Sequence, residues 1–429
     1  MSSHRHTPLE RARLSLEGLS VADALGERLC LHTDIAGALV AARALPAAPW
    51  QWTDDTQMAL SVVAVLRNQG GIDPESLARS FADHCDASRG YSAATLELLG
   101  RLRAGGDWRV EAGQRFGGLG SWGNGAAMRV APVGAYFAEN LAVAAEQARC
   151  SAVITHAHPE AVAGAIAVAV AAALASRASG AAPSARDFLL AVATHLPESA
   201  VRLGIERAAV LDPATPVGTA ALELGNGARV SAQDTVPFAL WCAATSLGDY
   251  TETFWRAATG LGDMDTNCAI ACGISVLAAD SEAIPTEWLA AREPLPGWPF
   301  VDDPDATVTL YRPVGDRELA RIAHSNWREF PPRLPEQPIF YPVCNETYAR
   351  QIARDWNSVD AKHSFIGHVT RFRVRESYLS RYAVQVVGNG SHQEYWIPAE
   401  ELPEFNANII GEIEVIATYD EGRERVNLK

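Results

Sequence analysis

The chain has 429 residues, of which 48% are hydrophobic and 20% are charged, values typical of a globular protein and not of a disordered one. Its 51 acidic residues outnumber its 36 basic residues and give a net charge of −15. The basic residues form no dense block, which argues against nucleic acid as a partner. The seven cysteines include no CxxC pair, so we expect no disulfide framework and a cytoplasmic location, where thiols stay reduced.

The first three hundred residues carry mainly helical patterns. Residues 1–15 contain basic residues but no apolar stretch typical of a signal peptide, and we expect them to form a flexible tail. Over residues 16–300 apolar side chains recur at helical spacing, which predicts an all-α domain. The 15-residue apolar run from Ala161 to Ala175 is short for a bilayer, so it is predicted to be a buried core helix, with no membrane association.

The remaining residues differ in texture. Residues 301–338 are rich in proline, which cannot donate the hydrogen bonds of a helix interior, and they are predicted to form a linker. Residues 339–429 are predicted to form a small α+β accessory domain. Its helix would be capped by Asn345 and would bury one face, made of Tyr348, Ile352 and Trp356. Strands are predicted at 366–375, 382–387, 395–397 and 409–419, with a hairpin-type turn at 388–391.

Two clusters of acids and hydroxyls stand out within the helical region. They read Thr53-Asp54-Asp55-Thr56 and Gly262-Asp263-Met264-Asp265-Thr266, and each runs directly into an apolar helical pattern. A single Asp at a helix start is explained by capping, because its side chain accepts backbone N–H bonds. A second Asp beside it adds repulsion unless a hard cation binds several oxygens. The all-oxygen donor set favours Mg²⁺ or Mn²⁺ over Zn²⁺, and four carboxylates would neutralise two divalent ions.

Three further segments admit both structural and functional interpretations. The small residues of Gly123-Asn124-Gly125-Ala126 would let backbone N–H groups approach a phosphate or sugar, or would simply form a turn. Thr155-His156 precedes the predicted core helix, where His158 before Pro159 could serve as the cap and His156 as a ligand of the substrate. The segment 86–92, with an acid, an arginine and a tyrosine, is uninterpretable by itself.

Taken in order, these segments resemble the ADP-ribosylglycohydrolase family, which includes the dinitrogenase reductase-activating glycohydrolase. The resemblance covers roughly residues 16–290, and the tail beyond about 300 is not covered. The matching pieces are Ala22-Asp23-Ala24-Leu25-Gly26, Trp52-Thr53-Asp54-Asp55-Thr56, Arg89-Gly90-Tyr91, Gly123-Asn124-Gly125 through Met128-Arg129, Thr155-His156 and Gly262-Asp263-Met264-Asp265-Thr266.

The resemblance implies an orthogonal all-α bundle with a binuclear Mg²⁺ or Mn²⁺ centre in a cleft that binds ADP-ribose. The implied metal ligands are Thr53, Asp54, Asp55, Asp263, Asp265 and Thr266. The implied substrate-binding residues are Arg89, Gly90, Tyr91, Gly123, Asn124, Gly125, Ala126, Met128 and His156.

The catalytic carboxylate is less well defined by the resemblance. Asp86, Glu27 and Asp55 are the candidates for the general acid or base. The family would place an acid several residues after Gly26, where this chain has Cys30. Two other departures are Ala22, where the family usually has a glycine, and Ser92 after the tyrosine of Arg-Gly-Tyr. None of these changes removes an implied metal ligand.

The function implied by the resemblance is metal-dependent hydrolysis of the bond between ribose C1 and an acceptor. The acceptor would be a modified protein side chain, arginine first, or a small ADP-ribosylated compound. An alternative is a non-catalytic ADP-ribose binder, or an immunity or regulatory protein that retains the metal site. In that case the C-terminal domain could bind a protein partner, and three arginines at alternate positions of one predicted strand could meet it, namely Arg371, Arg373 and Arg375.

Overall fold

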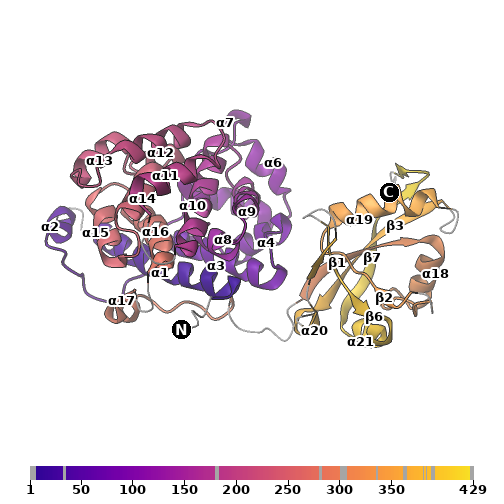
Figure 1. Cartoon of the computed structure of the whole chain (residues 1–429). Helices are drawn as coiled ribbons and strands as arrows, with labels where there is room; N and C mark the ends of the chain where they lie inside the picture. The colour runs from indigo at the N-terminus through magenta and orange to yellow at the C-terminus, as the bar shows by residue number, and fades with distance from the viewer. Residues whose placement is uncertain are drawn as a thin grey trace. The chain divides into compact units, whose positions relative to one another are not determined.

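The computed structural model describes residues 6–31, 35–178, 183–279, 283–299, 307–334, 337–360, 365–379, 381–382, 384–387 and 392–425. The chain divides into two compact units, unit 1 from Met1 to Pro299 and unit 2 from Phe300 to Lys429 (Figure 1). Unit 1 is helical, and its described part contains isolated bridges but no strand. Unit 2 mixes helices with strands. The predicted fold class, an all-α bundle followed by a small α+β region, is confirmed.

Unit 1 begins with the long helix α1 (Pro8–Cys30). The Thr7 side chain accepts a bond from the backbone of Glu10, and the Glu10 side chain accepts one from the backbone of Thr7. This capping box starts the helix well before residue 16, so the predicted tail is wrong over residues 8–15. Residues 1–5 lie outside the described residues.

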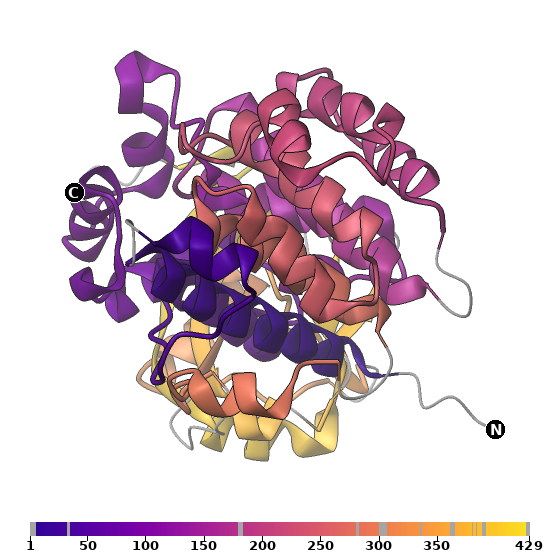
Figure 2. The same ribbon diagram turned by 90° about the vertical axis from the view of Figure 1, so that its left-hand side faces the viewer.

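Three helices bring the functional segments together. Helix α1 runs beside α16 (Met264–Ser275) (Figure 2) and also packs against α3 (Asp54–Gln69). Both α3 and α16 begin at one of the two acid–hydroxyl clusters. The contact with α1 is close, because a Cβ atom on Gly26 would lie 2.8 Å from the Asp265 Cα. Packing against a common helix therefore draws the two clusters toward each other.

The centre of unit 1 is the Ala-rich helix α10 (Pro159–Arg177). It packs against α8 (Ala131–Tyr136), α9 (Leu141–Val153) and α14 (Ala232–Thr245). Among the described helices it alone is long and apolar enough to cross a membrane, and 72% of its apolar window is buried inside the protein. Small side chains allow this packing, since Ala lets helix axes approach while keeping high helix propensity. The helix is a core element, as predicted.

The other helices complete the described part of unit 1. Their bounds are α2 (Ala36–Ala41), α4 (Pro74–His84), α5 (Ala93–Arg103), α6 (Trp108–Gly113), α7 (Arg115–Gly118), α11 (Ala185–Ala193), α12 (Ala200–Val210), α13 (Val217–Leu224), α15 (Tyr250–Thr259) and α17 (Thr286–Ala291). Two of them, α11 and α12, also pack against α10. Short 3₁₀ turns connect them at Ala87–Arg89, Asn124–Ala126 and Val276–Ala278.

Unit 2 is built on an antiparallel sheet with the strand order β1-β3-β7-β8. The strands are β1 (Thr307–Gly315), β3 (Ile366–Arg375), β7 (Ile409–Asp420) and β8 (Arg423–Glu424). Two short pairs accompany the sheet, β2 (Ile339–Phe340) with β6 (Ile397–Pro398), and β4 (Val384–Val386) with β5 (Gln393–Tyr395). The helices are α18 (Asp316–His324), α19 (Glu346–Asp355), α20 (Glu376–Leu379) and α21 (Leu402–Ala407).

The predicted linker needs correction, because β1 and α18 both lie within residues 301–338. Strand β1 is an edge strand of the four-stranded sheet and contains Pro313 opposite Val369. Proline lacks an N–H but is tolerated on an edge strand, so the proline count concealed the strand. Asn345 caps α19 as predicted, whereas Trp356 is 65% exposed and does not join the buried face. The predicted turn at 388–391 lies outside the described residues.

Candidate metal centre and substrate cleft

The two acid–hydroxyl clusters line one cleft, although 211 residues separate Asp55 from Thr266. The Thr266 hydroxyl donates to Asp55 Oδ1 over 3.5 Å, which is a long contact. Thr53 is the N-cap of α3 and accepts a bond from the Asp55 backbone. Asp263 stands at the N-cap position of α16 but makes no capping bond. The Thr53 hydroxyl therefore caps α3, whereas the Asp263 side chain has no capping role at the start of α16.

These carboxylates are unfavourably placed for ionised groups. Burial, followed by repulsion from Asp23 and Asp265, raises the pKa of Asp54 to about 8. Burial and repulsion from Asp265 likewise raise the pKa of Asp263 to about 8. The pKa of Asp55 is raised well above its usual value, again chiefly by burial. Acids that lose this much from ionising are stabilised by a nearby cation.

The chemistry of the donors fits a hard divalent cation. The Asp55 Oδ2 atom is buried and has no hydrogen-bond partner in the protein, which is costly unless another group satisfies it. The neighbouring donors are all carboxylate and hydroxyl oxygens, as Mg²⁺ and Mn²⁺ prefer. In the described part of the chain, no three His, Cys, Asp or Glu side chains are already arranged to hold a metal ion. Ligation would therefore require the Thr hydroxyls, small side-chain adjustments, or both.

A buried acid of α1 lies behind the first cluster. Asp23 is fully buried and accepts bonds from the backbone and hydroxyl groups of both Thr53 and Thr56. Burial and repulsion from Asp265 raise its pKa to about 7, while the Thr donors oppose that rise. Asp23 thus orients the threonines of the cluster. Asp23 belongs to one of the motifs matched in the sequence, where it is assigned no role. An acid inside the apolar run Val21–Leu25 nevertheless indicates a buried, hydrogen-bonded carboxylate.

The opposite wall is the Gly-Asn-Gly loop. Asn124 donates to Asp263 Oδ2 over 2.6 Å and to the Thr235 hydroxyl over 3.1 Å, so it connects the loop to the second cluster. The glycines give room for the imidazole of His156, since a Cβ atom on Gly125 would lie 2.8 Å from its ring and one on Gly123 would lie 3.1 Å away. Substitution at either glycine would therefore push this ring.

His156 is held by a buried arginine. The Arg129 guanidinium donates to the Thr155 hydroxyl over 2.9 Å, and that hydroxyl lies 2.7 Å from His156 Nδ1. Because the Thr155 hydroxyl accepts a bond from Arg129, its own proton is available to donate to His156 Nδ1. The neutral ring then carries its proton on Nε2. Burial, with Arg129 and Arg115 nearby, lowers the pKa of His156 to about 3, so the ring is neutral. His156 lines the cleft and can offer an N–H to a substrate oxygen.

The cleft has a volume of about 310 Å³. Its lip includes Arg115 and Phe116, and the Phe116 ring packs on Trp122 with the centroids 5.1 Å apart. The guanidinium of Arg115 brings a positive charge to a cleft whose other charged side chains are the four Asp residues of the clusters. Arg115 and Phe116 thus suit an anionic or aromatic group, whereas the Asp side chains suit a cation or a polyhydroxylated group.

The predicted residues fall into two groups. Those that line the cleft are Asp54, Asp55, Gly90, Gly123, Asn124, Gly125, Met128, His156, Asp263, Asp265 and Thr266. Those that do not line it are Glu27, Thr53, Asp86, Arg89, Tyr91 and Ala126. Thr53, Tyr91 and Ala126 are buried behind the wall.

Glu27 and Asp86 differ in their surroundings. Glu27 is half-buried, and burial followed by repulsion from Asp265 raises its pKa. Asp86 is exposed and accepts bonds from the backbone and hydroxyl of Ser88, which lowers its pKa. Asp86 therefore caps the 3₁₀ turn at Ala87–Arg89 and is not brought to the cleft. Of the two acids, only Glu27 has a pKa that is raised by a charge of the second cluster, that of Asp265.

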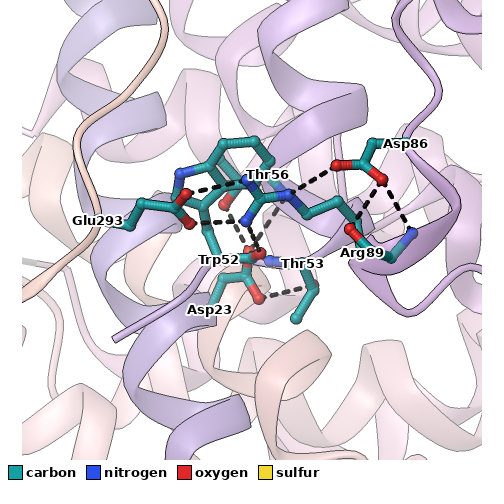
Figure 3. A network of polar contacts seen from close by, with 8 residues as sticks. Asp23, Trp52, Thr53, Thr56, Asp86, Arg89 and Glu293 are labelled. Carbon is teal, nitrogen blue, oxygen red and sulfur yellow. Dashed lines mark hydrogen bonds and ion pairs between the residues drawn. The ribbon is translucent and has the colours of Figure 1, made fainter. Parts of the chain in front are cut away.

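Arg89 also has structural partners. Its guanidinium donates to both carboxylate oxygens of Glu293, at 2.6 and 3.0 Å, and to the Trp52 carbonyl at 3.1 Å (Figure 3). The guanidinium lies 3.5 Å from the centroid of the Trp52 ring. This network holds Arg89 outside the cleft rather than in it. Glu293 lies just beyond the stretch that the sequence resemblance covers.

The family model and the similar curated proteins identify the chain as a hydrolase that acts on ADP-ribosyl groups. The chain belongs to the ADP-ribosylglycohydrolase family, whose sequence model matches residues 4–317. It is 28% identical over 279 residues to the ADP-ribosylhydrolase ARH3 of Bos taurus, covering 56% of this chain and 74% of that protein. An uncharacterized protein of Archaeoglobus fulgidus is 29% identical, covering 65% of this chain and 90% of its own length.

Among solved structures, a chain of an ADP-ribosylglycohydrolase-related protein complex is similar. It is 25% identical, with a TM-score of 0.48, and the match covers 67% of this chain and 93% of that one.

Proposed function

We propose that the protein is a metal-dependent ADP-ribosyl hydrolase that cleaves the bond between ribose C1 and a modified protein side chain or a small acceptor. The observation that carries the proposal is the meeting of two acidic helix starts in one cleft, with a buried Asp55 oxygen left unpaired. Arginine is the acceptor that we propose first, and the assay below compares it with the other acceptors. We also propose a reducing, cytoplasmic location, which the seven free cysteines support.

The metal would be held by oxygen donors of both clusters that line the cleft, namely Asp54, Asp55, Asp263, Asp265 and Thr266. Thr53 would join them only by giving up its hydrogen bond to Asp23. A divalent ion bound there supplies positive charge that orients sugar hydroxyls and favours the ionised form of water. We propose two ions, because four carboxylates balance two divalent charges. Mg²⁺ and Mn²⁺ both match this donor set.

Glu27 is the proposed acid or base. Its raised pKa lets it hold a proton closer to neutral pH than an exposed glutamate does, which suits proton transfer to a leaving group. It precedes Cys30 by three residues on α1, so the two side chains share one face of that helix. Glu27 could therefore replace the acid that the family resemblance would place at residue 30. Asp55 is the second candidate, since it lines the cleft itself.

The other cleft residues would bind and orient the substrate. His156, with its proton on Nε2, would donate to a phosphate or ribose oxygen. Asn124 holds the Gly-Asn-Gly loop against Asp263, so the loop stays beside the second cluster and would bind the same substrate. The exposed Phe116 ring at the lip offers a surface for a base to stack on.

The test is release of ADP-ribose from ADP-ribosyl-arginine, measured with added Mg²⁺ or Mn²⁺ and after EDTA treatment. We expect release that EDTA abolishes and added metal restores. ADP-ribosyl-serine peptides and a small O-linked compound, assayed in parallel, identify the acceptor. Metal-independent release would contradict the metal proposal. No release from any of these substrates by the metal-bound protein would contradict hydrolysis.

Cys30 favours a second candidate function, an ADP-ribose-binding protein that does not turn over. A thiol whose pKa is raised to about 12 by burial and by the charges of Asp265 and Glu27 cannot replace a carboxylate in proton transfer at neutral pH. Calorimetry with ADP-ribose, paired with the turnover assay, separates the two functions. Tight binding without turnover would establish the binder.

A further inference from the structure

The last segment of unit 1 passes close to the first acid–hydroxyl cluster. After α17 ends at Ala291, the chain pairs with Trp50 in a parallel bridge. The Trp50 N–H donates to the Ala291 carbonyl over 2.7 Å, and the Glu293 N–H donates to the Trp50 carbonyl over 2.8 Å. Trp50 is only 2% exposed and packs edge-on against Trp288. The backbone of Glu293 is thus bonded to Trp50, which precedes Trp52 by two residues.

This segment is attached at two other points. Arg292 forms an ion pair with Glu17 at 3.1 Å and donates to the Ser20 hydroxyl at 3.2 Å, both on α1. Ser20 is one helical turn before Asp23, which orients the threonines of the cluster. Further on, the Trp298 ring stacks on His84, with the centroids 3.8 Å apart and the planes 8° apart. The segment 291–298 therefore joins α1, the Trp50–Thr53 segment and the end of α4.

At the centre of this arrangement is the pair Glu293–Arg89. The Glu293 carboxylate accepts two hydrogen bonds from the Arg89 guanidinium. The guanidinium also stacks over the Trp52 ring and donates to the Trp52 carbonyl (Figure 3). The Arg89 side chain is 17% exposed and that of Glu293 is 29% exposed, so water screens the pair only partly. Trp52 is buried and directly precedes Thr53. The position of the Arg89 side chain therefore restrains the backbone of Trp52, the residue before the first acid–hydroxyl cluster.

We infer that Glu293 is a positioning residue. It acts through Arg89 and Trp52 to hold in place the start of α3, Thr53–Asp55, which we call the turn. Arg89 belongs to the same support and does not contact the substrate, because its side chain binds Glu293, Asp86 and Trp52 and does not line the cleft. The inference deepens the proposed function and rests on it, because only there are the residues of the turn assigned as metal ligands. A planar bidentate guanidinium stacked on an aromatic ring cannot be replaced by lysine without loss.

The first experiment measures the turn without metal or substrate. Hydrogen exchange of full-length, metal-free protein is followed by mass spectrometry in the peptide spanning residues 50–57, with peptides from α10 as the internal reference. For Glu293→Gln we expect exchange in residues 50–57 to be faster by about tenfold, because a charge-assisted pair that restrains the turn is lost. Exchange in α10 should not change. The matched control is Glu97→Gln, which breaks an exposed pair with Arg101 and should leave residues 50–57 unchanged.

The second experiment measures ion affinity. Because supports of ligand residues typically change affinity by about 10- to 100-fold, Glu293→Gln should weaken Mn²⁺ binding by that factor. Arg89→Lys should do the same, and the double variant should be no worse than either single variant, since both act through one contact. The KM for the ADP-ribosyl substrate at saturating metal should stay within about twofold of wild type in all three variants, because neither residue touches the substrate.

Several results would overturn the inference. Unchanged exchange in residues 50–57 for both Glu293→Gln and Arg89→Lys would do so, as would additive losses in the double variant. A raised KM in Arg89→Lys with no effect of Glu293→Gln would place Arg89 on the substrate. If wild-type protein neither binds Mn²⁺ nor hydrolyses substrate, the proposed function fails, while the exchange measurement still decides the role of Glu293.

Discussion

At the scale of single residues, the environments of two carboxylates separate their roles. Glu27 is half-buried beside the second cluster with a raised pKa, whereas Asp86 is exposed and caps a turn with a lowered pKa. Glu27→Gln should therefore reduce kcat by about 10²- to 10⁴-fold with little change in KM. The matched Asp86→Asn variant should keep kcat within about threefold of wild type. Steady-state release of ADP-ribose measures both, and the reverse order of effects would exchange the two assignments.

A second prediction at this scale concerns the proton of His156. If Thr155 donates to Nδ1, removing its hydroxyl frees the ring to adopt the other tautomer and weakens the bond from Nε2 to the substrate. Thr155→Val should raise KM by about 3- to 10-fold, the value of one hydrogen bond, whereas Thr155→Ser should restore it. Nitrogen NMR of labelled His156 reports the tautomer directly. A protonated Nδ1 in wild type would contradict the assignment.

Which site residues could be predicted from sequence depends on how local their signal is. Asp54 and Asp263 stand beside second acids at helix starts, and this doubling is visible without any fold. Glu293 carries no such mark, because its role arises from a bridge between Trp50 and Arg292 that joins distant parts of the chain. Arg89 was misleading for the same reason. An arginine in a loop has the chemistry of a phosphate ligand, and only the fold shows that Glu293 and Trp52 occupy it.

At the scale of elements, the contact between α8 and α10 is the tightest that the glycines reveal. A Cβ atom on Gly134 would lie 1.9 Å from the Ala169 carbonyl oxygen, so Gly134→Ala must push the two helices apart. We expect a loss of about 1–3 kcal/mol in the free energy of unfolding. Gly100→Ala on α5 is the matched control, since no atom lies within 4 Å of its Cβ position. It should be neutral or stabilising by up to about 1 kcal/mol. Chemical denaturation measures both, and equal effects would refute the close contact.

Elements were predictable where their pattern, a continuous apolar run or an alternation, was not broken by proline. The apolar run of α10 and the alternation of β3 both correspond to observed elements. Strand β1 was missed because Pro313 suggests a break, and only its position at the edge of the sheet makes proline acceptable. The start of α1 was missed because the basic residues near the N-terminus are typical of a tail, whereas the capping box of Thr7 and Glu10 is a short local signal. Tertiary placement and local capping thus account for the two errors.

At the scale of the whole molecule, the acidic cleft couples folding to pH and to metal. In folded unit 1 Asp54 and Asp263 are half-buried and their pKa values are raised to about 8, whereas an unfolded aspartate has a pKa of about 3.9. The folded protein therefore binds more protons than the unfolded chain between these values. Their contribution to stability is fully present below about pH 4 and is lost as the pH rises through about 8. A divalent cation bound by the folded state opposes this loss.

We therefore expect the Tm of the metal-free protein to fall between pH 5 and pH 8, and Mg²⁺ to raise it more at pH 8 than at pH 6. With Mg²⁺ at about 100 times its Kd, the gain at pH 8 should be about 5 °C or more for a domain of this size. Differential scanning calorimetry follows both units of the full chain. Asp263→Asn is the control, because removing one carboxyl group should flatten the pH slope and reduce the gain from metal. A Tm that rises from pH 5 to pH 8, or a metal gain equal in both proteins, would show that the buried acids do not control the stability of unit 1.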